Sequence, residues 1–314
     1  MITENYLDED VAYLLGLIVM RGQLYDRGSE RGITIEFPFK SLEVEGYNQE
    51  LYLQLSVNRI RDRIQELVES HVRVDQVGEA FVFSIRFLQN PVTWRNLRYL
   101  LSNRRSYKEF QIPENVMNAP RAVQIEFLRG VADVGGFIRE SNRYVDGRRR
   151  VYLEVHNRNW LLPIQLCALL QQKLDVPVQL IQWGHPNTRE PEGGHNWARE
   201  HQVKIFAEAF ETVGFTIEYK NETLEKFARQ DRKLHGALHK CNPNPEIRRV
   251  KKKKRHADEK SSTLPARLRN HHYDAYWQIC RALGCKQCVS ATSPLPFEDD
   301  VDEEGEIENA TTSD

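Results

Sequence analysis

Four side chains near the C-terminus have the types and the spacing of a metal site. They are Cys241, His272, Cys285 and Cys288. Cys285 and Cys288 form a Cys-x-x-Cys pair, a spacing that suits two thiolate ligands of a structural zinc ion. Cys241 is the candidate third ligand. The fourth position is open between His272, His271 and His239, and a redox pair or plain thiols are the alternatives to zinc.

The segment between these ligands is strongly basic. Residues 226–272 contain fifteen Lys and Arg against four Asp and Glu, and the densest run is Lys251, Lys252, Lys253 and Lys254. A segment with so much charge and so few apolar residues cannot pack a core by itself. It is typical of a surface that binds phosphates, and a solvated linker is the alternative.

The overall charge of the chain hides this basic surface. The 314 residues have a formal net charge of −1, but residues 297–314 hold nine acids and no Lys or Arg. Such a block predicts a disordered acidic tail, or a nucleic-acid mimic that folds back onto a basic surface. The apolar run VAYLLGLIVM, 11–20, is too short to cross a bilayer. We expect a cytoplasmic, nucleoid-associated protein that makes no membrane contact.

Two glycine-bearing helical stretches predict an internal repeat. AYLLGLIVMRG ends at Gly22 and FLRGVADVGG ends at Gly136, and Gly16 matches Gly130 at a separation of 114 residues. A glycine inside a helix costs about 1 kcal/mol relative to alanine. The matched pair therefore predicts that the two helices pack closely through Gly16 and Gly130. Gly22 and Gly136 should end the helices in the left-handed conformation that glycine favours.

The elements after each helix also match. Period-two alternation and helical spacing predict strands at 31–39, 72–87, 148–156, 176–183 and 201–207, and helices at 55–71 and 157–174. The predicted fold is α+β, with two pseudo-symmetric αββαββα repeats. The expected boundaries are 1–110 and 111–222 for the repeats, 223–296 for a basic extension and 297–314 for the tail.

These residues resemble the LAGLIDADG family of homing endonucleases in its single-chain, two-motif form. LLGLIVMRG, 14–22, and LRGVADVGG, 128–136, are the two motif copies, and the resemblance covers about 1–222. It implies a saddle of two four-stranded antiparallel sheets over a DNA major groove. It also implies that the motif helices form the interface and point their C-terminal ends at the centre of the site.

The catalytic positions of the motifs are degenerate. The family places a metal-binding acid next to last in each motif, where this chain has Arg21 and Gly135. The fallback acid is Asp133, which is turned about 200° round the helix from position 135. Other compensating acids are Glu36, Asp146 and Glu154. We therefore expect no catalysis, and Mg²⁺ only if the protein is an endonuclease after all.

Basic and polar residues that alternate with core positions are the candidate DNA contacts. They are Arg73, Arg86, Arg139, Arg148, Arg149, Arg150, Tyr152 and Lys204, together with the four lysines 251–254. Arg contacts give affinity through phosphates and specificity through base edges. Arg148–Arg150 is the densest predicted patch in the repeats.

The sequence thus favours a monomeric, sequence-specific double-stranded DNA-binding protein on an inactive LAGLIDADG frame. It would be a regulator or the target-recognition component of a DNA-processing system with other proteins. Two alternatives stay open: an active or nicking metal-dependent endonuclease with relocated acids, and an RNA-binding splicing cofactor of the maturase type.

Overall fold

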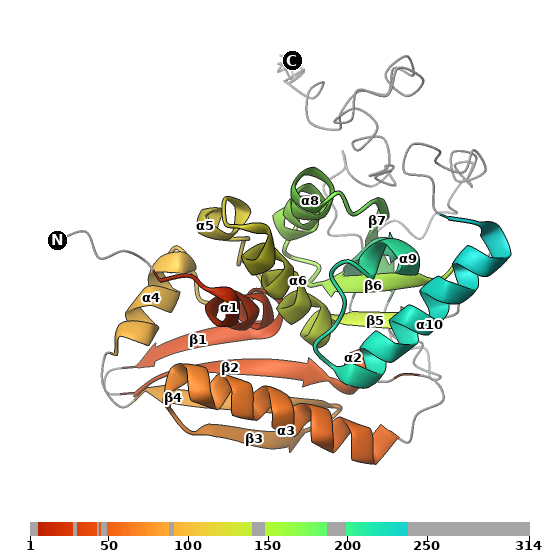
Figure 1. Cartoon of the computed structure of the whole chain (residues 1–314). Coiled ribbons are helices and arrows are strands. Elements are labelled where there is room, and N and C mark those ends of the chain that lie inside the picture. The colour runs from red at the N-terminus through yellow and green to blue at the C-terminus, as the bar shows by residue number, and fades with distance from the viewer. Residues whose placement is uncertain are drawn as a thin grey trace, which may run out of the picture.

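The computed structural model describes residues 6–27, 30–42, 44, 49–87, 91–139, 148–186 and 199–237. The first repeat begins with a helix that passes directly into a strand (Figure 1). Its elements are α1 (Glu9–Arg21), β1 (Gly22–Arg27), β2 (Glu30–Pro38), α2 (Phe39–Leu42), α3 (Gln49–Val68), β3 (Val72–Val77), β4 (Ala80–Phe87) and α4 (Val92–Leu100). Asp8 caps α1 by accepting from the amide of Val11 at 2.9 Å.

The second repeat follows the same order. Its elements are α5 (Glu114–Met117), α6 (Arg121–Gly135), β5 (Gly136–Arg139), β6 (Arg150–Val155), α8 (Leu161–Ala168) with a π-helical turn (Leu169–Lys173), β7 (Val178–Pro186), β8 (Arg199–Phe206), α9 (Ala207–Phe210) and α10 (Glu218–His235). The expected boundary after residue 222 falls inside α10, so the second repeat and the start of the basic extension share one helix.

Each repeat contains a four-stranded antiparallel sheet, and the two sheets have the same topology. The strand orders are β1-β2-β4-β3 and β5-β6-β8-β7. Ile33 faces Ile85 in the first sheet, and Leu153 faces Val203 in the second. These four side chains are fully buried on the core side. The α+β class with antiparallel sheets therefore agrees with the prediction from the period-two alternation.

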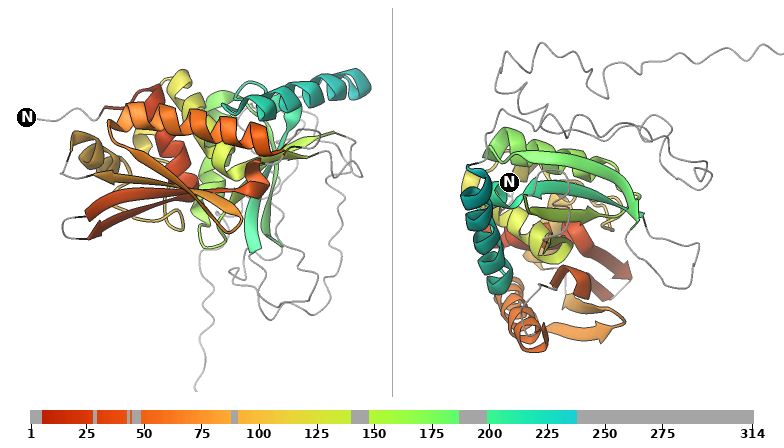
Figure 2. Two further views of the ribbon diagram at one scale, coloured as in Figure 1. Left: turned by 90° about the horizontal axis from the view of Figure 1, so that it is seen from below. Right: turned by 90° about the vertical axis from the view of Figure 1, so that its right-hand side faces the viewer.

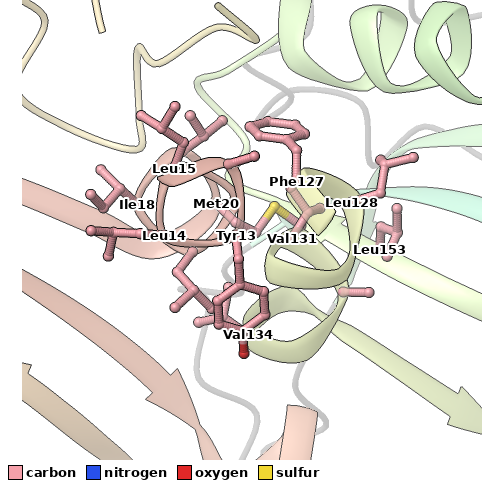
Figure 3. Packing of buried hydrophobic residues seen from close by; sticks show 14 of the residues in the cluster. Tyr13, Leu14, Leu15, Ile18, Met20, Phe127, Leu128, Val131, Val134 and Leu153 are labelled. Carbon is pink, nitrogen blue, oxygen red and sulfur yellow. The ribbon is translucent and has the colours of Figure 1, made fainter. Parts of the chain in front are cut away.

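Helices α1 and α6 pack against each other at the middle of the molecule (Figure 3). A Cβ on Gly16 would lie 2.1 Å from the carbonyl oxygen of Phe127, and one on Gly130 would lie 2.2 Å from that of Tyr13. Only glycine allows backbones to approach this closely. This is the contact that the matched mid-helix glycines predict.

The glycines that end these helices have another role than the predicted one. Gly22 and Gly136 are extended, with φ of −94° and −104°, so neither takes the left-handed conformation. Each packs against the preceding helical turn instead. A Cβ on Gly22 would lie 2.6 Å from the Cα of Ile18, and one on Gly136 would lie 2.5 Å from the carbonyl oxygen of Ala132. Glycine lets the chain leave the helix directly into a strand.

The two longest helices, α3 and α10, lie along one side of the molecule (Figure 2). They meet where Arg59 of α3 donates to Glu218 of α10 at 2.5 Å, and Tyr219 of α10 donates to the carbonyl of Leu42 in α2. The sheets therefore keep one face toward the helices and the core. We call the opposite face of each sheet its outward face. None of the described helices is long and apolar enough to cross a membrane.

Candidate nucleic-acid interface

A cluster of four charged side chains lies where the end of α1 meets the second sheet. Arg21 donates to Glu200 Oε1 at 2.9 Å and to the carbonyl of Glu154 at 3.3 Å. Lys40 donates to both oxygens of the Glu154 carboxylate, at 2.7 and 2.8 Å, and Gln202 donates to one of them at 2.7 Å. We call Arg21, Lys40, Glu154 and Glu200 the central charge cluster.

The pKa values of the two acids of the central charge cluster shift in opposite directions. Burial and the nearby Glu200 carboxylate raise the pKa of Glu154, although Lys40 opposes the rise. Burial acts the same way on Glu200, but its ion pair with Arg21 outweighs burial and lowers its pKa. Glu200 therefore stays ionised as the counterion of Arg21. Each acid already has a cation as a neighbour.

The second degenerate position, Gly135, is a packing site. A Cβ there would lie 2.5 Å from two atoms of the Met20 side chain, so position 135 has no room for a carboxylate while Met20 keeps its place. Arg21 and Gly135 thus differ in what surrounds them as well as in type.

Asp133, the fallback acid, lies inside the core. It is 0% exposed. Its carboxylate accepts from the Tyr13 hydroxyl at 2.9 Å and from the backbone amides of Thr216 and Ile217 at 3.2 and 3.4 Å. Burial raises its pKa despite these bonds and the nearby Lys220. Asp133 therefore joins α1, α6 and the start of α10, and it has no path to a substrate.

Lys220 completes this buried network from α10. Its ammonium donates to the carbonyls of Ala132, Asp133 and Gly136, at 3.0, 3.3 and 2.8 Å, and so satisfies the C-terminal end of α6. Burial lowers the pKa of Lys220 to about 7, although Asp133 opposes the shift. No local pattern points to this residue, because a lysine near the start of a polar helix is usually solvated.

The outward face of the first sheet is accessible. Its described residues include Gln23, Tyr25, Thr34, Glu36, Arg73, Asp75, Val82, Ser84 and Arg86. Arg73 and Arg86 are exposed on this face, which is the orientation expected for them. Arg73 forms a surface pair with Asp75 at 2.8 Å. Such a pair contributes little stability, so it leaves Arg73 able to exchange partners.

The outward face of the second sheet differs from the prediction. Arg139 is exposed, but Arg150, Tyr152 and Lys204 are 2%, 3% and 9% exposed. Tyr152 stacks on Phe137, with ring centroids 5.0 Å apart, and Lys204 lies over the Tyr152 ring. These three residues do point outward, so their orientation agrees with the alternation. They are buried on that face, and groove contact by them stays a prediction.

The contacts of Arg150 explain why side chains on the outward face of the second sheet are buried. Its guanidinium bonds Gln179 and donates to the carbonyl of Arg148 at 2.7 Å, and it lies over the Phe206 ring. Burial, followed by the neighbouring Arg150 charge, lowers the pKa of Lys204 to about 8. Stacking and hydrogen bonding use these side chains inside the protein, which an alternation pattern does not reveal.

The predicted Arg148–Arg150 patch fastens α10 to the second sheet. Arg149 is buried and pairs with Asp231 at 2.6 Å. Arg148 pairs with Glu208 at 2.9 Å and donates to the carbonyls of His235 and Gly236, both at 3.0 Å, at the end of α10. Arg148 and Arg149 thus hold α9 and α10 against the second sheet, and groove contact by these two residues stays a prediction.

Several predicted sites lie outside the described residues. They are Lys251–Lys254 and the zinc ligands Cys241, His272, Cys285 and Cys288. Within the ranges that the structure describes, no group of three or more His, Cys, Asp or Glu side chains could hold a metal ion. The compensating acids Glu36 and Glu154 are described. Glu36 is exposed on the outward face of the first sheet, while Glu154 belongs to the central charge cluster.

Two members of the central charge cluster, Lys40 and Glu200, were not among the candidates. Glu200 had a usable signal, because it alternates with Gln202 and Lys204 along REHQVK and so shares their outward face. Lys40 follows a strand end and depends on how that strand approaches the other sheet. Only the tertiary structure places it.

No protein-family model matches the chain, and no curated protein matches it. Among solved structures, the N-terminal LAGLIDADG domain of WhiA is 12% identical; the match covers 67% of this chain and 79% of that one, with a TM-score of 0.37. Full-length WhiA from Thermatoga maritima is 13% identical over 73% of this chain, with a TM-score of 0.43, and the chain spans 62% of its length. The homing endonuclease I-DmoI, in complex with DNA and Ca, is 17% identical over 65% of this chain and 86% of its own, with a TM-score of 0.34.

These similarities concern the fold alone. Independently of them, the chain shows two sheets of one topology and two helices that cross through paired glycines. The chain therefore has a LAGLIDADG-like fold.

Proposed function

We propose that the protein binds double-stranded DNA in a sequence-specific way and does not cleave it. In this proposal the two sheets form a pseudo-symmetric saddle, and the duplex lies along their outward faces. The ends of α1 and α6 then point at the middle of the bound site. The protein acts as a monomer in the cytoplasm, as a regulator or as the recognition component of a DNA-processing system.

The observation that carries the absence of cleavage is the pairing of Arg21 with Glu200. Hydrolysis of a phosphodiester by this kind of site needs carboxylates that can bind a divalent cation. The carboxylates of the central charge cluster already have Arg21 and Lys40 as partners. A cation at this point favours the retention of a phosphate and opposes the binding of Mg²⁺.

Duplex binding is supported by cations on separate parts of the chain. Arg73 and Arg86 lie exposed on the outward face of the first sheet, and Arg139 is exposed on the second. The segment 226–272 has a net charge of +11 by sequence, and we propose that it binds phosphates as well. We also propose that a zinc ion joins the two ends of its basic loop. These contacts supply affinity, while base-edge contacts from the first sheet supply specificity.

Selection from random duplexes with the purified full-length chain tests the proposal. We expect an enriched sequence. If the protein contacts about six phosphates, a plot of the logarithm of its binding constant against the logarithm of the salt concentration should have a slope of about −5. The selected duplex should stay intact with Mg²⁺ or Mn²⁺. Failure to enrich any sequence, or an affinity that salt does not change, would refute sequence-specific electrostatic binding. Stronger binding of structured RNA in competition would favour the splicing-cofactor alternative.

One observation favours a second candidate, an endonuclease with relocated acids. Glu154 and Glu200 lie in the same cluster and influence each other's pKa. If Arg21 and Lys40 moved away on DNA binding, two carboxylates would face the duplex. Metal-dependent cleavage of the selected site that is lost in Glu154→Gln and Glu200→Gln would establish this function in place of the first.

A further inference from the structure

A shallow, partly open hollow lies beside β1, at the edge of the first sheet and away from the central charge cluster. Its lining residues are Leu24, Tyr25, Asp26, Trp94, Arg98, Arg104 and Arg105. Three arginines thus line one small concave surface, together with the buried Trp94. We call it the arginine hollow.

The single acid that lines the arginine hollow is already neutralised. Asp26 accepts from Arg31 and from Arg98, each at 3.2 Å. Arg98 also donates to the side chain of Asn103 at 3.1 Å. Asp26 therefore holds Arg98 in place and does not compete for the other arginines.

Arg104 and Arg105 are the cations that remain. Among the described residues, neither guanidinium forms an ion pair. The Glu109 carboxylate accepts from the backbone amide of Arg105 at 2.8 Å and not from its side chain. Arg104 is half-buried and Arg105 is exposed. Arg104 and Arg105 follow each other in the chain, and an anion bound between two such charges lowers their repulsion.

The backbone before these arginines is strained in a way that fixes their position. Ser102 and Asn103 both have left-handed φ, 51° and 57°, which is uncommon for residues other than glycine. The amide of Asn103 bonds the carbonyl of Arg98 at 2.8 Å, and the amide of Leu24 bonds the carbonyl of Arg105 at 2.8 Å. Backbone hydrogen bonds therefore hold the turn at both ends, to α4 and to β1.

We propose that the arginine hollow is a phosphate-binding site in which Arg104 and Arg105 donate to the phosphate oxygens and Arg98 supports them. Guanidinium groups match phosphate geometry through paired N–H donors. The phosphate comes either from a nucleic-acid backbone, which rests on the proposed function, or from a free phosphate compound.

The test compares the full-length chain with two double variants. Arg104→Gln/Arg105→Gln removes the proposed donors, while Arg61→Gln/Arg95→Gln removes the same charge from surfaces outside the hollow. The first measurement is the midpoint of thermal unfolding in inorganic phosphate against chloride at equal ionic strength. The second is the salt slope for binding of the selected duplex.

We expect phosphate to raise the unfolding midpoint of the native chain and of the control variant, and to raise that of Arg104→Gln/Arg105→Gln clearly less, because a ligand stabilises only the state that binds it. A duplex salt slope that becomes shallower by about 1 to 2 only in this variant assigns the phosphate to the nucleic-acid backbone. An unchanged slope assigns it to a free compound. An equal phosphate effect in all three proteins overturns the site. A native chain that binds no duplex refutes the proposed function, and the phosphate measurement then decides the hollow alone.

Discussion

The guanidinium of Arg21, at the last residue of α1, donates to the Glu200 carboxylate of β8 at 2.9 Å across 179 positions of the chain. Both side chains are nearly buried, with exposures of 10% and 12%. The pair joins the first motif helix to the sheet of the other repeat. This ion pair lies at the helix position where the resemblance to LAGLIDADG homing endonucleases implies a metal-binding acid.

Replacing Arg21 with alanine should lower the free energy of unfolding by about 3 kcal/mol, because it leaves the Glu200 carboxylate without its main counterion. Chemical denaturation measures the change. Arg61→Ala is the control, since Arg61 pairs with Asp62 at the surface, and it should cost less than about 1 kcal/mol. A loss for Arg21→Ala as small as the control's would show that the central pair contributes no stability.

Gly16→Ala and Gly130→Ala should each cost about 3 kcal/mol or more, because each new methyl group overlaps a carbonyl oxygen of the facing helix. Thermal unfolding and the recovery of folded protein measure this. Gly78→Asn is a suitable control, because no atom lies within 4 Å of a Cβ there and asparagine tolerates its left-handed φ of 58°. Tolerance of alanine at 16 and 130 would contradict the close helix contact.

Asp133→Asn should destabilise the protein by about 1–3 kcal/mol without changing DNA binding, because its carboxylate is fully buried and joins parts of the core. Tyr13→Phe removes the same cross-helix bond from the other side. A double-mutant cycle should give a coupling energy above about 0.5 kcal/mol. Additive losses would mean that the two residues act independently, and a loss of activity toward DNA alone would give Asp133 a functional role.

Stability should rise with pH from about 7 to about 10. Lys220 has a folded pKa of about 7, below its ordinary value of 10.5, so the unfolded chain binds a proton that the folded chain lacks within this window. The free energy of unfolding should therefore increase by up to about 1.4 kcal/mol per pH unit from this group. Urea denaturation at a series of pH values measures the slope.

Lys220→Met should flatten that pH dependence. Lys204, whose pKa is lowered to about 8, adds to the rise only in the upper part of the same window, so Lys204→Met should make the slope shallower only above about pH 8. An unchanged slope in Lys220→Met would show that the buried ammonium keeps its ordinary pKa.

Two variants should separate effects on stability from effects on DNA binding. They are Arg149→Ala and the double variant Arg73→Ala/Arg86→Ala. Loss of Arg149 breaks the buried pair with Asp231 and should cost about 3–5 kcal/mol. Loss of Arg73 and Arg86 should leave stability within about 0.5 kcal/mol and make the duplex salt slope shallower by about 2. Denaturation and salt-dependent binding measure the two effects. The reverse pattern would place the DNA contacts on the second sheet.

Local patterns predicted the elements well. The strand residues alternate because one face of each sheet packs on the core, and the predicted strand at 31–39 is β2 at Glu30–Pro38. The paired glycines predicted the helix contact because nothing else explains glycine at both positions. The exposure of side chains on the sheets was harder to predict, since Tyr152 and Arg149 are buried by partners from other elements. Lys40 and Glu200 meet only after both repeats have folded, so no local pattern could pair them.

The two outward faces differ although their topology is shared: one offers exposed cations, while the other has most of its cations buried in contacts with the protein. A duplex held by such a molecule would be read unequally on its two sides. Its recognition sequence need not be a palindrome, and the bound protein would have one defined orientation along the DNA.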